Sequence, residues 1–263
     1  AWDYLGESCM GWTYESYKGL PLFANQGMID SEGKPLAAMA FLQVVWGIRT
    51  KPFIGVRPLN HAKESPTKGS WQFTDAIDSW NWPGYEGSKA TVEVYSPGNA
   101  ARLTLNGTVI GTKTLKNFKA VFHTRYQSGT LTAEVLDAGG NVLSSHSLST
   151  GKGEMQLRAI PEKKTLRANG LDLCYLPIAF TDEKGNLLPA MERQVDLEVT
   201  GALKLIGLGS ALYKTDETFD KPYHNTYRGC ALAVLKAGYT PGNAVITVKS
   251  AGVNPVTIQL EVK

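Results

Sequence analysis

From residue 71 onward the chain alternates apolar and polar residues in short runs, and this pattern restricts the fold more than any other feature. Successive side chains of a β-strand point to opposite faces, so a period of two predicts strands with one buried face. Turn residues bound the runs: Asn106-Gly107 is typical of a two-residue type I′ hairpin, and 137–141 (DAGGN) marks a second hairpin. Short alternating strands separated by such turns predict a β-sandwich. The runs are ATVEVYS (90–96), ARLTLN (101–106), AVFHTRY (120–126) and LTAEVLD (131–137).

A glycine-containing stretch, 149–154 (STGKGE), interrupts the alternation and is interpreted as a linker. The same pattern resumes after it and continues to the final run, 256–263 (VTIQLEVK), which predicts a second sandwich. Within this second part, residues 207–229 are irregular and rich in tyrosine. A loop of this length in a compact domain is usually functional or packed on a neighbour.

The first fifty residues follow a different pattern. The chain opens with AWDYLGES (1–8), which we interpret as a buried strand over residues 1–6 that enters a loop at Gly6. A helix is predicted over 34–47 (KPLAAMAFLQVVWG), with proline at its start and glycine after its end. Its predicted apolar face consists of Leu36, Met39, Leu42 and Val45, flanked by Ala40 and Phe41. A single strand and helix cannot bury both faces of the strand, so this segment is expected to belong to a larger structure or to lean on the first sandwich.

Composition excludes several functional classes. Of the 263 residues, 43% are hydrophobic and 19% charged, as in ordinary folded domains, and the net charge is only +3. No apolar run approaches the roughly 18–20 residues that span a bilayer, so no membrane association is expected. The basic residues are dispersed rather than arranged in a stripe, so no nucleic-acid partner is expected either.

The cysteines and histidines show no metal-binding spacing, and we predict neither a metal site nor a cofactor. Cys174 and Cys230 are in phase with the apolar positions of two different strands. The pattern favours two buried free thiols and leaves a disulfide between them open. The four histidines lie in separate segments without a nucleophile motif beside them.

Several longer motifs, taken in order, resemble the C-terminal part of glycoside hydrolase family 2 enzymes of the β-galactosidase type. They are SWNWPGYEG (79–87), VEVYSPGNAARLTLNGTVIG (92–111) and RANGLDLCYLPIAFTDEKGNLLPA (167–190). The opening AWDYLGES resembles the last strand of that family's (β/α)₈ barrel, and residues 26–46 resemble the loop and helix that follow it. The resemblance implies a mainly β chain: a βα remnant of the barrel at 1–50, an immunoglobulin-like β-sandwich at 51–152 and a second one at 153–263.

The resemblance also implies where chemistry takes place. Family 2 enzymes are similar to other retaining glycosidases in using two carboxylates, roughly 5–5.5 Å apart, and both come from earlier barrel strands. Neither maps onto this chain, so we expect no catalytic residue here, an accessory role, and no hydrolysis by the chain alone. Trp2, Phe23 and Gln26 are the residues that the resemblance places at the sugar-binding site of the intact enzyme. Asp3 and Glu7 are an alternative candidate for a catalytic carboxylate pair, but their spacing on an extended strand places them too far apart.

Two other functions stay open at this point. A carbohydrate-binding module would display coplanar exposed aromatic residues, for which Trp80, Trp82 and Tyr85 or the tyrosine-rich loop 213–227 are candidates; packing is the favoured interpretation of both groups. A structural or adhesive immunoglobulin-like array is disfavoured because it has no use for AWDYLGES.

The same reasoning gives the expected partners. They are a carbohydrate substrate in the intact enzyme and the rest of its barrel. Apolar surface uncovered in the isolated chain predicts self-association through residues 1–50, or packing of this segment on the sandwich. A periplasmic or secreted location is expected from the family alone.

Overall fold

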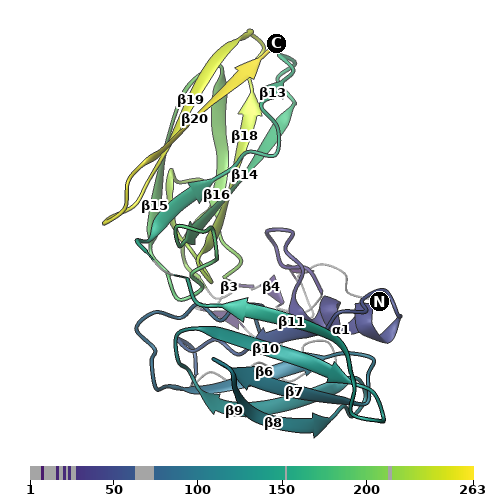
Figure 1. Ribbon diagram of the computed structural model, residues 1–263. Helices are drawn as coiled ribbons and strands as arrows, with labels where there is room; N and C mark the ends of the chain where they lie inside the picture. Colours follow the sequence, from purple (N-terminus) through teal and green to yellow (C-terminus); the bar gives the residue numbers. More distant parts are fainter. Residues whose placement is uncertain are drawn as a thin grey trace. The chain divides into compact units, whose positions relative to one another are not determined.

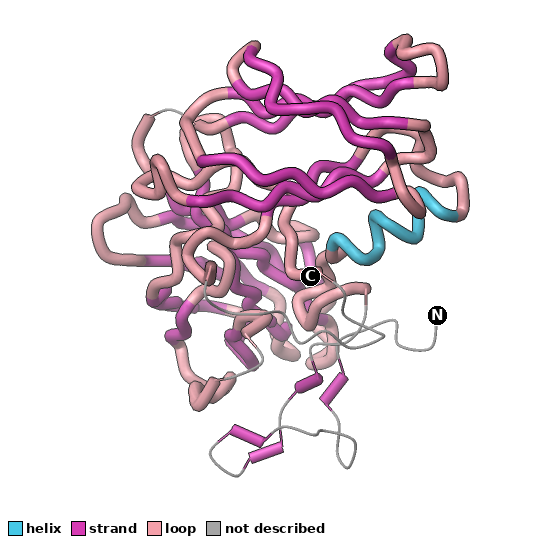
Figure 2. The backbone as a smooth tube through the Cα atoms, turned by 90° about the horizontal axis from the view of Figure 1, so that it is seen from below, coloured by secondary structure: helices cyan, strands magenta, loops and turns pink. Residues whose placement is uncertain are grey.

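The computed structural model describes residues 28–62, 74–151, 153–212 and 215–263, together with the backbone of four short strands nearer the N-terminus. Those strands are β1 (Glu7–Ser8), β2 (Ser16–Tyr17), β3 (Leu20–Pro21) and β4 (Phe23–Ala24). β1 pairs with β4 and β2 with β3, both antiparallel. The strand predicted at residues 1–6 lies outside the described residues. The chain divides into two compact units, Ala1–Gly151 and Lys152–Lys263, and strands dominate both (Figures 1 and 2).

The first unit contains a sandwich of two antiparallel sheets. The three-stranded sheet has the order β5 (Phe53–Val56), β6 (Lys89–Tyr95), β9 (Lys119–Arg125). The four-stranded sheet has the order β11 (Val142–Ser149), β10 (Thr130–Leu136), β7 (Ala100–Leu105), β8 (Thr108–Thr114). Alternate residues of β7 and β10 are buried, which confirms the period-two prediction.

The predicted turns are present. Asn106 and Gly107 both have positive φ, 52° and 80°, as a type I′ turn between β7 and β8 requires. In the turn 137–141, the Asp137 carboxylate accepts hydrogen bonds from the backbone N–H (2.9 Å) and the side-chain amide of Asn141. Gly140 there has a φ of 83°, a conformation that glycine adopts without strain. The turn 182–186 in the second unit repeats these interactions, with Asp182 accepting from Asn186.

The second unit is also a sandwich. One sheet has the order β12 (Gln156–Ala159), β14 (Leu173–Thr181), β18 (Cys230–Ala237), β16 (Leu203–Gly209). The other has the order β13 (Thr165–Leu166), β20 (Val256–Val262), β19 (Gly242–Lys249), β15 (Gln194–Gly201), β17 (Tyr223–Asn225). All pairs are antiparallel except β13 with β20. The order corresponds to the ABED and CFG sheets of an immunoglobulin fold, with short edge strands added.

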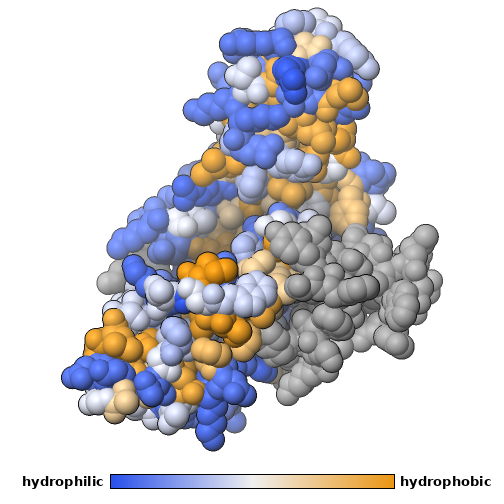
Figure 3. Space-filling model, turned by 90° about the vertical axis from the view of Figure 1, so that its right-hand side faces the viewer, coloured by the Kyte–Doolittle hydropathy of each residue, from blue (hydrophilic) through white to orange (hydrophobic). Residues whose placement is uncertain are grey.

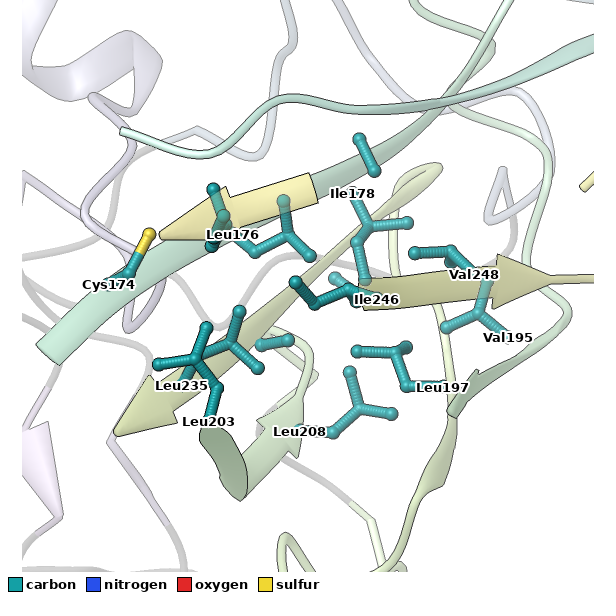
Figure 4. Close-up of a cluster of buried hydrophobic side chains, with 14 of the residues drawn as sticks. Cys174, Leu176, Ile178, Val195, Leu197, Leu203, Leu208, Leu235, Ile246 and Val248 are labelled. Carbon is teal, nitrogen blue, oxygen red and sulfur yellow. The ribbon is translucent and has the colours of Figure 1, made fainter. Parts of the chain in front are cut away.

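The inner faces of these two sheets form one apolar core (Figure 4). Cys174 lies in it fully buried, and Cys230 is buried at the other end of the neighbouring strand. The register opposes Cys230 to Ala179, five positions along β14 from Cys174. That offset is about 17 Å, far beyond the reach of a disulfide. Cys174 and Cys230 are both buried and are not joined by a disulfide, as the favoured interpretation predicted.

The predicted helix is present as α1 (Ala37–Val45), the single helix of the described ranges. Its C-terminal end is a Schellman motif: the N–H of Ile48 binds the carbonyl of Gln43, and Gly47 has a φ of 71°. The predicted apolar face is only partly right, because its flanking residues Ala40 and Phe41 pack on the sandwich whereas its four central residues do not form the packed face. The residues packed on the sandwich are Ala37, Ala40 and Val44, whereas Leu36, Met39 and Leu42 are only half-buried and Val45 is exposed. Small alanine side chains let the helix approach the sheet closely, and pattern matching by hydrophobicity underrates them.

Candidate functional site

The residues that the sequence assigns to a sugar site are largely outside the described part of the chain. Trp2 and Gln26 lie outside the described residues, as does Asp3. Phe23 lies in β4, where its backbone pairs with Ser8 of β1. Glu7 lies in β1 and pairs with Ala24. Their roles stay predictions.

The aromatic run 79–87 is a packing element, not a binding platform. Trp80 and Trp82 are both fully buried. The indole N–H of Trp80 donates to the carbonyl of Gln127 (3.0 Å), and the hydroxyl of Tyr126 accepts from the backbone N–H of Trp82 (3.1 Å). Trp80 and Tyr126 also meet edge to face, with centroids 4.9 Å apart. A sugar cannot reach either indole, so the carbohydrate-binding interpretation of these two tryptophans is wrong.

The tyrosine-rich loop also packs largely on its own unit. Phe219 closes on β16, since its carbonyl accepts from the N–H of Leu208 (2.9 Å) and its ring fills the space where Gly209 lacks a side chain. The same ring stacks on the imidazole of His224, with ring centroids 5.7 Å apart and an angle of 12° between the planes. Tyr223 on β17 and Phe219 are both partly exposed, but the ring of Phe219 is engaged by the imidazole of His224.

His224 is the polar residue at the centre of this loop and is fully buried. Its Nδ1 lies 2.8 Å from the carbonyl oxygen of Asn225, which only accepts, so Nδ1 carries the proton. Its Nε2 has no hydrogen-bond partner. Glu217 fastens the loop by accepting from both the backbone N–H and the side-chain amide of Asn225 (3.0 and 2.9 Å). The other carboxylate oxygen, Oε2 of Glu217, lies 3.8 Å from Nδ1 of His224, beyond hydrogen-bond distance, so these contacts hold the loop in place.

Across the described ranges, no group of three histidine, cysteine, aspartate or glutamate side chains has the geometry of a metal site. Helix α1, the single helix of those ranges, lacks the length and apolarity needed to cross a bilayer. The second unit carries a shallow depression of about 530 Å³ lined by Glu154, Met155, Gly252, Val253 and Asn254. Glu154 is the one carboxylate in its lining, so the depression offers no acid and base pair.

The most elaborate polar arrangement is a buried ionic cluster on the outer face of the three-stranded sheet. Glu93, in the middle of β6, is fully buried. Its Oε1 accepts from Arg57 (3.0 Å to Nη2), and its Oε2 accepts from Lys119 (2.6 Å) and from the hydroxyl of Tyr95 (2.6 Å). We call Arg57, Glu93, Tyr95 and Lys119 the Glu93 cluster.

The cluster sets the protonation state of its members. Burial alone would raise the pKa of Glu93, but hydrogen bonds from Lys119 and Tyr95, with the charges of Lys119 and Arg57, outweigh it and hold the pKa below its usual value. Burial and the adjacent Glu93 charge raise the pKa of Tyr95 far above its usual range. At neutral pH the carboxylate is therefore ionised and the phenol protonated, which suits a structural anchor rather than a proton donor.

Helix α1 is attached at this cluster. The Tyr95 ring stacks on Phe53 of β5, with centroids 5.4 Å apart and an angle of 14°. Phe41 of α1 meets the same ring edge to face at 5.4 Å and 81°. Ala76 belongs to the same buried apolar cluster as Phe53 and Tyr95. Around Tyr95 the outer face of this sheet is thus covered by apolar side chains beside the ionic cluster.

The sequence analysis did not identify this cluster, because the sequence carries only part of its signal. Alternation in ATVEVYS assigns Glu93 and Tyr95 to the solvent-facing side of β6. They do lie on the side opposite Val92 and Val94, but the helix and the segment after residue 74 cover that side. A glutamate two residues before a tyrosine on one strand face gives no sequence sign of such a cover.

Comparisons with known proteins agree with the two-unit architecture. Residues 157–259 match the family model described as glycoside hydrolase family 2 C-terminal domain 5, and residues 87–144 match a domain of unknown function (DUF4982). Beta-galactosidase BoGH2A of Bacteroides ovatus is 27% identical over 184 residues, which cover 69% of this chain and 21% of that protein.

Solved structures extend the likeness to nearly the whole chain. A glycosyl hydrolase family 2 member from Bacteroides cellulosilyticus superposes with a TM-score of 0.82 at 26% identity, over 97% of this chain and 34% of that one. A family 2 member from B. cellulosilyticus DSM 14838 gives 0.78 at 27% identity, over 90% and 32%. The chain therefore spans about a fifth to a third of the length of these relatives.

Proposed function

We propose, because this chain belongs to glycoside hydrolase family 2, that it acts as the C-terminal accessory region of a retaining, β-galactosidase-like enzyme that hydrolyses O-glycosidic bonds. The likeness to the B. cellulosilyticus structure carries the proposal, since it extends over 97% of this chain but only 34% of that one. The B. ovatus relative is a beta-galactosidase, which favours a galactoside as the substrate of the intact protein.

Hydrolysis by the chain alone is not expected. Retention requires a nucleophile and an acid/base roughly 5–5.5 Å apart and in contact with the substrate. Glu93 is buried and occupied by two cations and a phenol, so it serves neither role. In this proposal the two catalytic carboxylates come from barrel strands outside this chain, and Trp2, Phe23 and Gln26 contribute to the sugar pocket that those strands complete.

Helix α1 supplies the proposed contact with the rest of the barrel. One side of the helix packs on the sandwich through Ala40 and Val44. Beyond it, Val45, Trp46 and Ile48 remain 39%, 57% and 68% exposed. Figure 3 shows patches of hydrophobic residues, coloured orange, on the side of the molecule that faces the viewer. Exposed apolar side chains gathered at the end of the helix and in the turn after it are typical of a surface that contacts a partner. The same surface is the proposed route of self-association through residues 1–50 in the isolated chain. A periplasmic or secreted location is proposed from the family.

The proposal is tested by assaying this chain on nitrophenyl β-galactoside, β-glucuronide and β-mannoside, with a full-length family 2 β-galactosidase as positive control and a glycan-binding screen on the same sample. We expect neither turnover nor binding. Turnover that disappears in an Asp3→Asn, Glu7→Gln double variant would overturn the proposal, whereas turnover that persists would identify a contaminating enzyme. Binding without turnover would favour a carbohydrate-binding module instead.

A further inference from the structure

The linker 149–154 is hydrogen-bonded to the aromatic run 79–87, a contact that neither sugar binding nor hydrolysis requires. The linker starts at Ser149, the last residue of β11. The next residue, Thr150, extends the pairing between β10 and β11 by one step, since its N–H donates to the carbonyl of Gly129 (2.8 Å). The side chain of Thr150 and the backbone of the residue after it bind the aromatic run.

The hydroxyl of Thr150 completes a chain of hydrogen bonds that starts and ends on the backbone of the run. Its Oγ1 donates to the carbonyl oxygen of Trp80 (2.7 Å), which only accepts. The hydroxyl of Tyr126 lies 3.1 Å from the same Oγ1 and therefore donates to it. Tyr126 in turn accepts from the N–H of Trp82 (3.1 Å). Hydrogen bonds linked in one direction in this way polarise and strengthen one another.

Gly151 is held by a second side chain of the run. Its N–H donates to Oδ1 of Asn81 (3.1 Å), and Asn81 is only 2% exposed. The backbone N–H of Asn81 donates to the hydroxyl of Ser79 (3.2 Å), which is buried as well. Release of the linker would therefore leave buried polar groups without partners, and this costs more free energy than the loss of an exposed hydrogen bond.

The part of the linker in the second unit is held by an exposed contact instead. The N–H of Glu154 donates to Oε1 of Glu183 (3.2 Å), and both residues are exposed. The same carboxylate lies over Gly153, where a Cβ atom would come within 2.1 Å of Cδ of Glu183. Water competes for an exposed hydrogen bond, so this contact is expected to contribute little.

We propose that residues 79–82 and Tyr126 form a socket for the linker. The socket makes the chain as far as Gly151 a fixed part of the first unit rather than a free tether to the second. It also gives a role to the aromatic run, whose tryptophans are buried and cannot stack on a sugar. Local opening of the linker then requires loss of the Thr150 and Gly151 hydrogen bonds, whereas the contact of Glu154 can break without them.

Trypsin cleavage after Lys152 of the full chain tests the socket, because a protease cuts a folded chain where it opens locally. Cleavage there should be much slower than in a synthetic peptide of residues 146–158. Thr150→Val keeps the shape of the side chain but removes the hydroxyl, so cleavage after Lys152 should accelerate about tenfold. Thr150→Ser restores a hydroxyl and should return the rate toward that of the unaltered chain.

Two matched controls separate the socket from a general loss of stability. Thr112→Val makes the same substitution at an exposed threonine of β8 and should leave cleavage after Lys152 unchanged. Glu183→Ala removes the exposed contact on the other side of Lys152 and should change the rate only slightly. Acceleration by either control equal to that by Thr150→Val would overturn the proposal.

Amide exchange in the unaltered protein gives a test that needs no folded variant. The N–H groups of Thr150 and Gly151 should exchange as slowly as the paired amides of β11, because both donate to acceptors within the first unit. Fast exchange of these two amides, or cleavage after Lys152 at the rate of the free peptide, would show that the linker is a free tether and would overturn the socket.

Discussion

The strands β6 in the first unit and β14 in the second are the inner strands of comparable sheets, yet they are buried differently. β14 alternates, with Cys174, Leu176 and Ile178 fully buried and the residues between them more exposed. In β6 the four residues from Val92 to Tyr95 are all fully buried. A strand buried on both faces belongs to a sheet covered on both faces. The β6 sheet of the first unit therefore holds another element on its outer face. The β14 sheet of the second unit buries only the face that lines the sandwich core.

The largest expected effect lies in the second unit. Ile178→Ala removes a fully buried side chain from the apolar core and should destabilise this unit by about 4 kcal/mol. Hydrogen exchange of peptides from both units of the full chain checks this, with loss of protection confined to residues 153–263. Ile206→Ala, at a 49% exposed position of the same unit, is the matched control and should cost well under half as much. Equal loss of protection in the first unit would show that the two sandwiches do not unfold independently.

A slightly smaller effect is expected in the first unit. Glu93→Gln keeps the shape of the side chain but leaves Arg57 and Lys119 without their anion, which should cost about 3 kcal/mol. The same exchange measurement should show lost protection in β5, β6 and α1, with the second unit unchanged. Glu134→Gln is the control, because Glu134 pairs with Arg102 on a partly exposed surface (2.7 Å) and should cost less than about 1 kcal/mol. Equal effects of the two variants would remove the special role of the Glu93 cluster.

The smallest expected effect is on how the stability of the first unit depends on pH. Because the pKa of Glu93 is lower in the folded state than in the unfolded chain, its contribution is complete above the unfolded pKa and is lost as pH falls through the folded pKa. Between neutral pH and pH 3 the first unit should therefore lose protection more steeply in the unaltered protein than in Glu93→Gln. Measuring exchange in both proteins across this range, with rates corrected for intrinsic pH dependence, checks it. Parallel curves would assign acid sensitivity to other carboxylates.

What the sequence predicted well is what depends on neighbouring residues. The alternation in LTAEVLD and the Asn106-Gly107 turn are local, and the structure confirms both. The C-terminal end of α1 was likewise found at Gly47, since its conformation depends on the last helical turn.

What the sequence could not supply depends on contacts between distant segments. Alternation in 90–96 places Glu93 on the face opposite Val92 and Val94, but it does not show whether another element covers that face. The helix face was only partly right for a related reason: Ala40 and Phe41 pack as predicted, but Ala37 was not predicted to be buried because its small side chain is not strongly apolar. Whether Cys174 could pair was left open until the β14–β18 register fixed the offset. The sugar-site residues Trp2 and Gln26 remain predictions, since they lie outside the described residues.

The parallel pairing of β13 with β20 has a mechanical consequence. Backbone hydrogen bonds join Glu261 to Lys164 and Lys263 to Leu166, and Ala168 donates in turn to the carbonyl of Lys263. A force that pulls residue 263 along the strand acts across these bonds, so they share the load and rupture together instead of peeling apart singly. Resistance of the second unit to stretching from this end is therefore set by strand direction, although β13 is only two residues long.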